Sequence, residues 1–484
     1  MQKSSAGPPE PRNLELRRAL GPWSTAAIVV GTAIGSAIFL VPAQMIQAVG
    51  SPAEVLAVWI FGGILTLFGA LTYAELSAAL PGAGGEYVYL SAAYGPFFGF
   101  LYGWTQTWVA KAASVATLAT GFFTYLGDFF PALGRVFFSI PLPIGPHGGP
   151  LEIRYGQLVG IALILALSGL NFLGVKVGGG VQVAVTAIKV SLLGGLILLG
   201  LLSGRGDPQN FHSSIAAQPG GISGFFLALV AALWAYDGWN NAGMLGSEID
   251  RPQKNLPRAL ISGTLAMMAI YLLVNLTYFY VLNSAEVGAS ERVAADAMRR
   301  VLGRPGAAAV SAAAMISIFA ALNGSILSGS RIPYAMARDG YFFAPIRRVN
   351  ARFRTPGAAI LLLGGWSSVV LLSGQYEQLY TLVIFPSWIL YGMTAASVIV
   401  LRRTQPGLKR PYRVPGYPVV PLFFVLVAAA LLYSTFRTSP RESGIGLTVI
   451  ILGLPFYFHW KRSQTEAYRG SEPGPETFPE KWGS

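Results

Sequence analysis

The chain of 484 residues contains no cysteine and only three histidines, and the histidines are scattered along it. Without cysteine there is no disulfide framework, no thiol nucleophile and no thiolate metal site. Charge is also scarce, because Asp, Glu, Lys and Arg make up 11% of the residues, against about 25% in soluble globular domains. A surface with so little charge is not wetted on all sides. These absences argue against a soluble enzyme, a nucleic-acid-binding protein and a secreted scaffold.

Apolar residues make up 53% of the chain, and its mean hydropathy is +0.54. The apolar runs are long enough for helices that cross the hydrocarbon core of a bilayer, which is about 30 Å thick and takes roughly 20 residues. The sequence therefore predicts an all-α membrane protein with 12 transmembrane helices. We expect them near residues 22–49, 54–80, 97–126, 156–173, 180–203, 222–249, 257–283, 306–336, 356–373, 377–401, 417–436 and 444–460.

The formal net charge is +13, from 34 basic and 21 acidic residues. On the predicted topology, 22 of the basic residues lie on the side of the two termini and nine on the other side, while Lys111, Lys189 and Arg331 fall within helices. Cytoplasmic loops are enriched in lysine and arginine. We therefore expect both termini in the cytoplasm. We attribute the excess of basic over acidic residues to membrane orientation rather than to nucleic-acid binding.

Three segments outside the predicted helices differ from the rest in composition. Residues 1–21 are polar and predict a cytoplasmic N-terminal segment. Residues 287–304 predict a short amphipathic helix at the surface. Residues 461–484 predict a cytoplasmic tail, and its Glu-, Pro- and Gly-rich part from residue 464 is typical of disorder.

Two of the predicted helices contain glycine and polar residues at mid-membrane depth, in residues 31–36 (GTAIGS) and 236–241 (YDGWNN). Unwound backbone is tolerated in a membrane only where it lines a cavity inside the protein; the alternative is that the glycines serve close helix packing. The two stretches lie five helices apart, which is typical of an inverted repeat with a binding site at the midplane. We expect repeats at 22–203 and 222–401, followed by two extra helices at 417–460.

The first interruption belongs to a longer motif, 31–39 (GTAIGSAIF). Further motifs follow at 73–76 (YAEL), 84–87 (GGEY), 234–240 (WAYDGWN), 255–259 (NLPRA), 323–325 (NGS), 330–331 (SR) and 443–448 (SGIGLT). In this order they resemble the L-type amino acid transporter family of the amino acid–polyamine–organocation superfamily. The resemblance implies two inverted five-helix repeats, broken first and sixth helices, and two extra C-terminal helices. It also implies transport of neutral amino acids, often by exchange and without sodium.

An amino acid carries a carboxylate and an ammonium, and a broken helix offers N–H groups to the first and C=O groups to the second. We expect the amides of residues 35–37 and the Ser36 hydroxyl to receive the carboxylate, although that hydroxyl has the alternative of bonding to its own helix turn. We expect the carbonyls of residues 32–34 and of the end of the sixth helix to face the ammonium. The resemblance implies the same positions, makes Trp234 an outer gate, and adds two aromatic walls on the tenth helix. The predicted substrate-binding residues are Thr32, Ala33, Ile34, Gly35, Ser36, Ala37, Trp234, Ala235, Asp237, Gly238, Phe385 and Trp388.

Two of these positions depart from the family pattern. Ala37 stands where the family usually has glycine, which predicts a tighter pocket. Asp237 stands where some relatives have glycine, and a carboxylate at this depth is a functional hypothesis by default. Its open roles are to pair with the substrate ammonium, to favour a basic substrate, to titrate in proton coupling, or simply to cap a half-helix or face an aqueous vestibule.

Two lysines lie within predicted helices. Lys189 resembles the fifth-helix lysine that takes the space of a structural sodium ion in sodium-independent members of the superfamily, where its ammonium links the broken first helix to the eighth. A buried lysine also suits proton coupling, and the alternative for Lys189 is an interfacial position. For Lys111 a pore-lining role and a structural ion pair stay open. Three acidic residues toward the cytoplasmic side predict inner salt bridges with three arginines. They are Glu75, Glu86 and Glu248, with Arg251, Arg331 or Arg338 as partners.

The function favoured by these features is sodium-independent amino acid transport by alternating access, through exchange or facilitated diffusion of neutral amino acids. The alternatives are a proton-coupled symporter that uses Lys189 or Asp237, and a transporter of cationic amino acids or amines that uses Asp237. We expect no enzyme activity, no cofactor and no metal, because no catalytic or metal-ligand cluster is found. Animal relatives carry a disulfide-linked accessory subunit, which this cysteine-free chain cannot attach. A prokaryotic inner membrane is the expected location.

Overall fold

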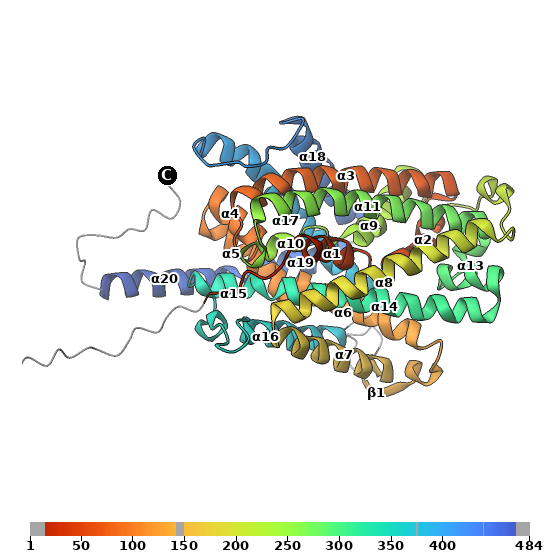
Figure 1. The fold of residues 1–484 in the computed structure, drawn as a ribbon, viewed down its shortest axis with the longest axis horizontal. Helices are drawn as coiled ribbons and strands as arrows, with labels where there is room; N and C mark the ends of the chain where they lie inside the picture. The colour runs from red at the N-terminus through yellow and green to blue at the C-terminus, as the bar shows by residue number, and fades with distance from the viewer. Residues whose placement is uncertain (1–14, 142–149, 374–375, 439, 471–484) are drawn as a thin grey trace, which may run out of the picture.

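The computed structural model describes residues 15–141, 150–373, 376–438 and 440–470. The long helices α3 (Pro52–Ala79), α11 (Pro252–Val281) and α14 (Arg304–Gly329) run along the longest axis of the molecule, and α8 (Val175–Leu202) crosses it obliquely (Figure 1). In the described part of the chain, ten helical stretches are long and apolar enough to cross a membrane, and the two helices α9 (Gly221–Tyr236) and α16 (Gly357–Leu371) are shorter but also apolar. The predicted helical membrane protein is thus confirmed in outline. Strands are limited, among the described residues, to one hairpin of β1 (Val136–Ile140) and β2 (Leu151–Arg154).

The first half of the described chain ends with the long helix α8. Its elements are α1 (Pro22–Ala33), α2 (Ala37–Val49), α3 (Pro52–Ala79), α4 (Glu86–Tyr94), α5 (Pro96–Thr105), the π-helical turn η1 (Gln106–Ala110), α6 (Lys111–Leu126), η2 (Pro131–Gly134), β1 (Val136–Ile140), β2 (Leu151–Arg154), α7 (Tyr155–Phe172) and α8 (Val175–Leu202).

The second half begins after the loop that follows α8. Its elements are η4 (Pro208–His212), α9 (Gly221–Tyr236), α10 (Asn241–Met244), η5 (Gly246–Glu248), α11 (Pro252–Val281), α12 (Ser284–Gly288), α13 (Val293–Leu302), α14 (Arg304–Gly329), α15 (Arg331–Arg338), η6 (Ala344–Arg347), α16 (Gly357–Leu371), α17 (Tyr376–Thr404), α18 (Val419–Thr438), α19 (Pro440–Leu452) and α20 (Leu454–Gly470).

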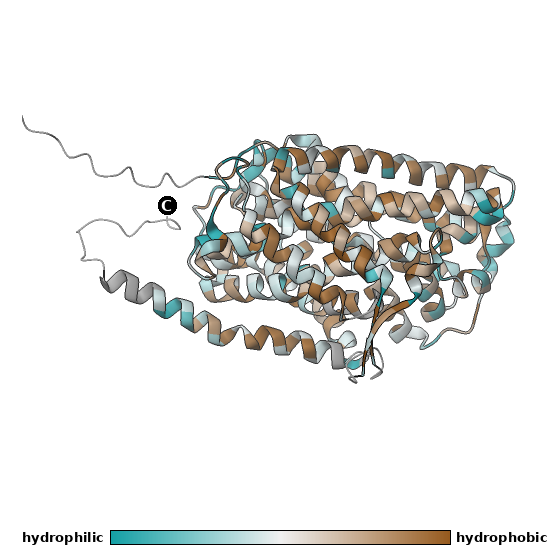
Figure 2. Cartoon of the chain, turned by 90° about the horizontal axis from the view of Figure 1, so that it is seen from below, coloured by the Kyte–Doolittle hydropathy of each residue, from teal (hydrophilic) through white to brown (hydrophobic). Residues whose placement is uncertain are grey.

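The sides of the bundle are apolar and its two ends are polar, as the hydropathy colours show (Figure 2). Helix α8, for example, exposes the large apolar side chains Leu198 and Leu202, and α18 exposes Leu426. Exposed apolar surface on this scale marks contact with a membrane or a partner. In a chain with membrane-length helices, these side chains face the lipid.

The first two helices lie inside the bundle. Helix α1 packs against α8, α11 and α14, and α2 packs against α9. Both are largely buried, with Ile28, Ile34 and Ile38 fully enclosed. Other helices therefore shield this segment from lipid, which is the condition for leaving backbone groups unpaired at mid-membrane depth.

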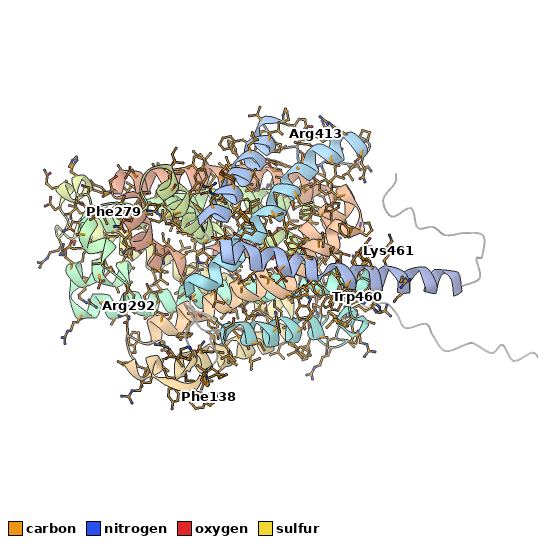
Figure 3. The ribbon with its side chains drawn as sticks, turned by 180° about the vertical axis from the view of Figure 1, so that it is seen from behind. Phe138, Phe279, Arg292, Arg413, Trp460 and Lys461 are labelled. Carbon is orange, nitrogen blue, oxygen red and sulfur yellow. The ribbon has the colours of Figure 1, made fainter. Side chains whose placement is uncertain are left out.

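Residues 287–304 contain the predicted short amphipathic helix as α13, and Arg292 directly before it lies at the end of the bundle opposite Lys461 (Figure 3). The C-terminal region differs from the sequence prediction. The expected helix 444–460 is divided at Gly453, where a Cβ would lie 2.7 Å from the Trp104 ring. Helix α20 then continues through 461–470, which was expected to be part of a disordered tail; residues 1–14 and 471–484 lie outside the described part.

Candidate functional site

Two non-helical stretches meet near the middle of the bundle. Helix α1 ends at Ala33 and α2 begins at Ala37; α9 ends at Tyr236 and α10 begins at Asn241. The Thr32 hydroxyl donates a hydrogen bond to the Gly238 carbonyl oxygen at 2.9 Å. Gly238 has a φ of +98°, and a Cβ on it would lie 3.1 Å from the carbonyl carbon of Thr32. The close approach of the two stretches therefore depends on glycine at this position.

A narrow cavity lies between the two stretches. Its volume is about 10 Å³, which is room for roughly one water molecule. Binding of anything larger requires the walls to move apart. The lining residues are Thr32, Ala33, Gly35, Ser36, Ala37, Ser114, Leu118, Trp234, Asp237, Gly238 and Ser325.

The N-terminal end of α2 opens onto this cavity through Gly35, Ser36 and Ala37. The first amides of a helix have no carbonyl partner within it and carry the positive end of the helix dipole. A Cβ on Gly35 would lie 2.9 Å from the Leu118 side chain, so glycine also permits close packing here. Binding of a carboxylate at these amides stays a prediction.

Several carbonyls expected to face an ammonium are already hydrogen bonded within the protein. The Ile34 oxygen accepts from Lys189 Nζ at 2.5 Å and from Ser317 Oγ at 3.1 Å. A carbonyl oxygen has two lone pairs, so these two contacts already engage the Ile34 oxygen, and its contact with a ligand stays a prediction. The Tyr271 hydroxyl lies 3.1 Å from the Ala33 oxygen and 2.6 Å from the Ala235 oxygen. One phenol thus bridges the last residue of α1 to α9.

Lys189 lies inside the bundle, on the face of α8 that packs against α1. Its side chain is 1% exposed, and its ammonium donates to the carbonyl oxygens of Gly31 at 2.8 Å, Ile34 at 2.5 Å and Ser317 at 3.2 Å. Gly31 and Ile34 belong to the first interruption, and Ser317 belongs to α14. The expected link between the broken segment and α14 is therefore present as direct contacts, and the alternative of an interfacial lysine does not apply.

Asp237 borders the cavity and is half-buried. Its Oδ1 accepts a hydrogen bond from the Tyr391 hydroxyl of α17 at 2.8 Å. Lys111, at the start of α6, is buried and donates to the Asn241 side-chain oxygen at 2.5 Å. Its positive charge also attracts the carboxylates of Asp237 and Glu86. Lys111 is not among the lining residues, and its hydrogen bond goes to an amide rather than to an acidic side chain, so both predicted roles stay open.

Comparison with known proteins identifies the chain. Residues 20–454 match the family model described as amino acid permease. The chain belongs to this family. The serine/threonine exchanger SteT of Bacillus subtilis (strain 168) is 33% identical over 92% of this chain and 98% of its own length. The b(0,+)-type amino acid transporter 1 of Homo sapiens is 32% identical over 93% of this chain and 90% of its own. The cystine/glutamate transporter of Homo sapiens is 28% identical over 93% of this chain and 87% of its own.

These relatives confirm the resemblance to the L-type amino acid transporters. The protein is an amino acid transporter and not an enzyme. The cavity between the two non-helical stretches is therefore the candidate substrate site of this amino acid permease.

The acidic residues of the permease pair differently from the prediction, with one exception. Glu248 and Arg331 form the predicted salt bridge; both side chains are fully buried, and Arg331 Nε and Nη2 reach the two carboxylate oxygens at 2.7 and 2.9 Å. Glu75 instead pairs with Arg402 at 2.7 Å and Arg410 at 3.5 Å. The predicted partners of Glu75 were therefore wrong. The observed partners were not predictable from local sequence, because Arg402 lies in the last turn of α17 and Arg410 lies beyond it, both far from Glu75 in sequence.

Glu86 also has no predicted arginine among its partners in the described residues. Its carboxylate accepts hydrogen bonds from the Asn240 amide and from the Tyr102 hydroxyl, the latter at 3.0 Å. Asn240 directly precedes α10. Glu86 therefore supports the second interruption rather than an inner salt bridge.

The two aromatic residues expected to wall the site lie elsewhere. Trp388 stacks on Phe424 of α18 with ring centroids 5.3 Å apart. Phe385 faces Gly446 of α19. Both are buried among the last helices of the chain, so neither lines the cavity. Trp234, the expected gate, is a lining residue and is 5% exposed.

Sequence reasoning missed three lining residues, Ser114, Leu118 and Ser325. Ser114 and Leu118 follow Lys111 at helical spacing, so Lys111, Ser114 and Leu118 lie on one face of α6. Ser325 ends the NGS motif that supported the resemblance. The helical spacing from Lys111 and the NGS motif are both visible in the sequence, but neither shows which helix face is turned toward the interruptions.

Proposed function

We propose that this permease is a sodium-independent exchanger of small neutral amino acids that works by alternating access. The observation that carries the proposal is the cavity bounded by both non-helical stretches, with Lys189 bound to the first of them. A fixed ammonium at this place supplies the positive charge that a sodium ion would otherwise bring. Facilitated diffusion through the same site is the nearest alternative.

The finer architecture is part of this proposal. Together with α9, continued by α10, and with α16, the ten membrane-length stretches would give 12 crossings. The first interruption lies in the first crossing of 22–203, and the second lies in the first crossing of 222–401. This correspondence supports two inverted repeats of five helices with broken first and sixth helices. Helices α18 to α20 would form the extra pair.

The substrate carboxylate would lie at the start of α2, against the amides of Gly35, Ser36 and Ala37. The ammonium would lie near Asp237, because the Ile34 carbonyl is already occupied by Lys189 and Ser317. Lys111 places a positive charge close to Asp237, which disfavours a second cationic group from a basic substrate side chain. The site therefore suits neutral amino acids better than cationic ones.

The side chain of the substrate would meet Ser114, Leu118 and Ser325. Two hydroxyls and the Ala37 methyl group favour a short, polar side chain. The serine/threonine exchanger among the relatives makes serine and threonine the first substrates to test.

The permease would lie in a prokaryotic inner membrane with both termini in the cytoplasm. The excess of lysine and arginine on the side of the termini supports this orientation. It would act without a disulfide-linked subunit, since it has no cysteine.

The test is exchange of labelled serine by the purified protein in liposomes loaded with each of the twenty amino acids in turn. We expect exchange with small neutral amino acids, none with lysine, and no change when choline replaces sodium. Absolute dependence on sodium would overturn the role of Lys189. Uptake driven into empty liposomes by a pH gradient alone would replace exchange with proton symport, and preferred exchange with lysine would replace the neutral substrate class.

A further inference from the structure

Three charged side chains lie in or against the second interruption, and the proposed transport step uses only one of them. Glu86 begins α4, Lys111 begins α6, and Asp237 follows α9. Glu86 is 0% exposed and Lys111 is 3% exposed. Charges this deeply buried are costly unless each is paired and hydrogen bonded. Their common position around one short segment therefore requires an explanation.

Three residues of this segment, Asp237, Asn240 and Asn241, are each held by a side chain from another helix. Lys111 Nζ donates to Asn241 Oδ1 at 2.5 Å, and the Asn240 amide donates to the Glu86 carboxylate. Asp237 itself accepts from Tyr391 at 2.8 Å. Side chains from α6, α4 and α17 thus hold three residues within a five-residue stretch.

The orientation of the two asparagines depends on these charges. An ammonium only donates hydrogen bonds and a carboxylate only accepts them. The side-chain oxygen of Asn241 therefore faces Lys111, and the side-chain nitrogen of Asn240 faces Glu86. Asn240 Oδ1 and Asn241 Nδ2, at the opposite ends of these amides, have no hydrogen-bond partner among the described residues. The contacts to Glu86 and Lys111 are therefore what fixes both amides.

The backbone before Lys111 is built for this contact. Residues Gln106–Ala110 form a π-helical turn, and the Lys111 N–H bonds to the Gln106 oxygen five residues earlier. Such turns widen a helix and frequently occur at functional sites. Here the turn ends at the residue whose side chain reaches α10.

The fully ionised form of this cluster is not neutral. In that form Glu86 and Asp237 contribute two negative charges and Lys111 one positive charge, while the phenols of Tyr102 and Tyr391 are neutral donors. The fully ionised form therefore has one negative charge left over beside the cavity. The ammonium of a bound amino acid is the group that would neutralise it.

We propose that Lys111 is a positioning residue that holds the second interruption through Asn241 and leaves the Glu86–Lys111–Asp237 cluster one positive charge short, so that the substrate ammonium completes it. This inference rests on the proposed function and extends it to a residue outside the cavity lining. It gives Glu86 and Lys111 a joint role that depends on charge as well as on shape.

The experiment compares Lys111→Met, Lys111→Arg, Glu86→Gln and the double variant Lys111→Met/Glu86→Gln in serine exchange, with thermal stability measured in parallel. Methionine has nearly the length of lysine without its charge, and glutamine can still accept from Asn240. We expect Lys111→Met to lower the exchange rate roughly tenfold to a hundredfold, since misplaced binding groups have effects of this size. The double variant has the wild-type net charge and should recover most of the lost rate, and Lys111→Arg should retain more activity than Lys111→Met.

The control is Lys176→Met, which removes an exposed lysine at the start of α8 and should leave exchange unchanged. Lys111→Met with wild-type exchange would overturn the positioning role. A double variant no more active than Lys111→Met would overturn the charge balance. If Lys111→Met does not fold, the same comparison is made on the yield of monodisperse protein, which Glu86→Gln must restore. Failure of the wild type to exchange any amino acid would instead refute the proposed function.

Discussion

Replacing Lys189 by alanine tests the contact that holds the first interruption. The ammonium donates to three carbonyl oxygens at 2.5, 2.8 and 3.2 Å and is buried. A hydrogen bond to a charged group contributes about 1.5–3 kcal/mol, so the two shorter bonds alone amount to roughly 3–6 kcal/mol. The alanine variant also leaves the three carbonyls without this donor and a hole along α8.

Not all of this free energy would be lost, because water can enter the space that the side chain leaves. Taking about 3 kcal/mol as the net loss in the transporting conformation, exchange should fall about a hundredfold. The assay is serine exchange in liposomes at matched protein content. Lys176→Ala, on the same helix but exposed, is the matched control and should behave as the wild type.

The same variant tests the charge itself. If the ammonium takes the place of a cation, added sodium or ammonium ions should restore part of the exchange in Lys189→Ala and have no effect on the wild type. Exchange by Lys189→Ala within about twofold of the wild type would refute the reasoning, since a twofold change corresponds to only about 0.4 kcal/mol.

Three further predictions follow from single contacts. Ala37→Gly removes a methyl group from the cavity lining and should improve competition by larger neutral amino acids by up to about tenfold. The control Ala43→Gly, elsewhere in α2, should not change this competition. Equal selectivity in the two variants would contradict the prediction. Gly238→Ala places a Cβ against Thr32 on a residue whose φ is +98°. It should lower the free energy of unfolding, measured by thermal denaturation, by about 1–3 kcal/mol. The control Gly180→Ala, with open space around the added Cβ, should leave that free energy unchanged. Glu248→Gln leaves the buried Arg331 charge unbalanced and should lower the free energy of unfolding by about 3–5 kcal/mol. An unchanged melting temperature would contradict this prediction, because water or another group would then compensate the Arg331 charge.

Local composition located the main features of the site. Glycine and polar residues within apolar helices marked 31–36 and 236–241, and the helix ends at Ala33 and Tyr236 fall in these stretches. The physical reason is local, because these residues weaken a helix wherever it lies. Lys189 was found in the same way, as a charge deep inside an apolar run.

Features that depend on packing between distant helices were not predictable in the same way. The Ile34 carbonyl is engaged by Ser317, 283 residues away in sequence. Trp388 turns toward Phe424 because α17 packs on α18, and a single sequence does not show which face of α17 meets which neighbour. Glu75 likewise finds Arg402 and Arg410 across the bundle.

The chain entering α1 is tied by its backbone to the chain leaving α10. Leu20 and Ile249 form a parallel bridge, in which the Leu20 amide bonds to the Glu248 oxygen at 3.0 Å and the Asp250 amide bonds to the Leu20 oxygen at 2.9 Å. The side chains of Leu20 and Ile249 are buried in the hydrophobic core, so core packing reinforces the main-chain pairing at this point. Proline has no amide hydrogen, and at Leu20 or Asp250 it would uncouple the two chain segments.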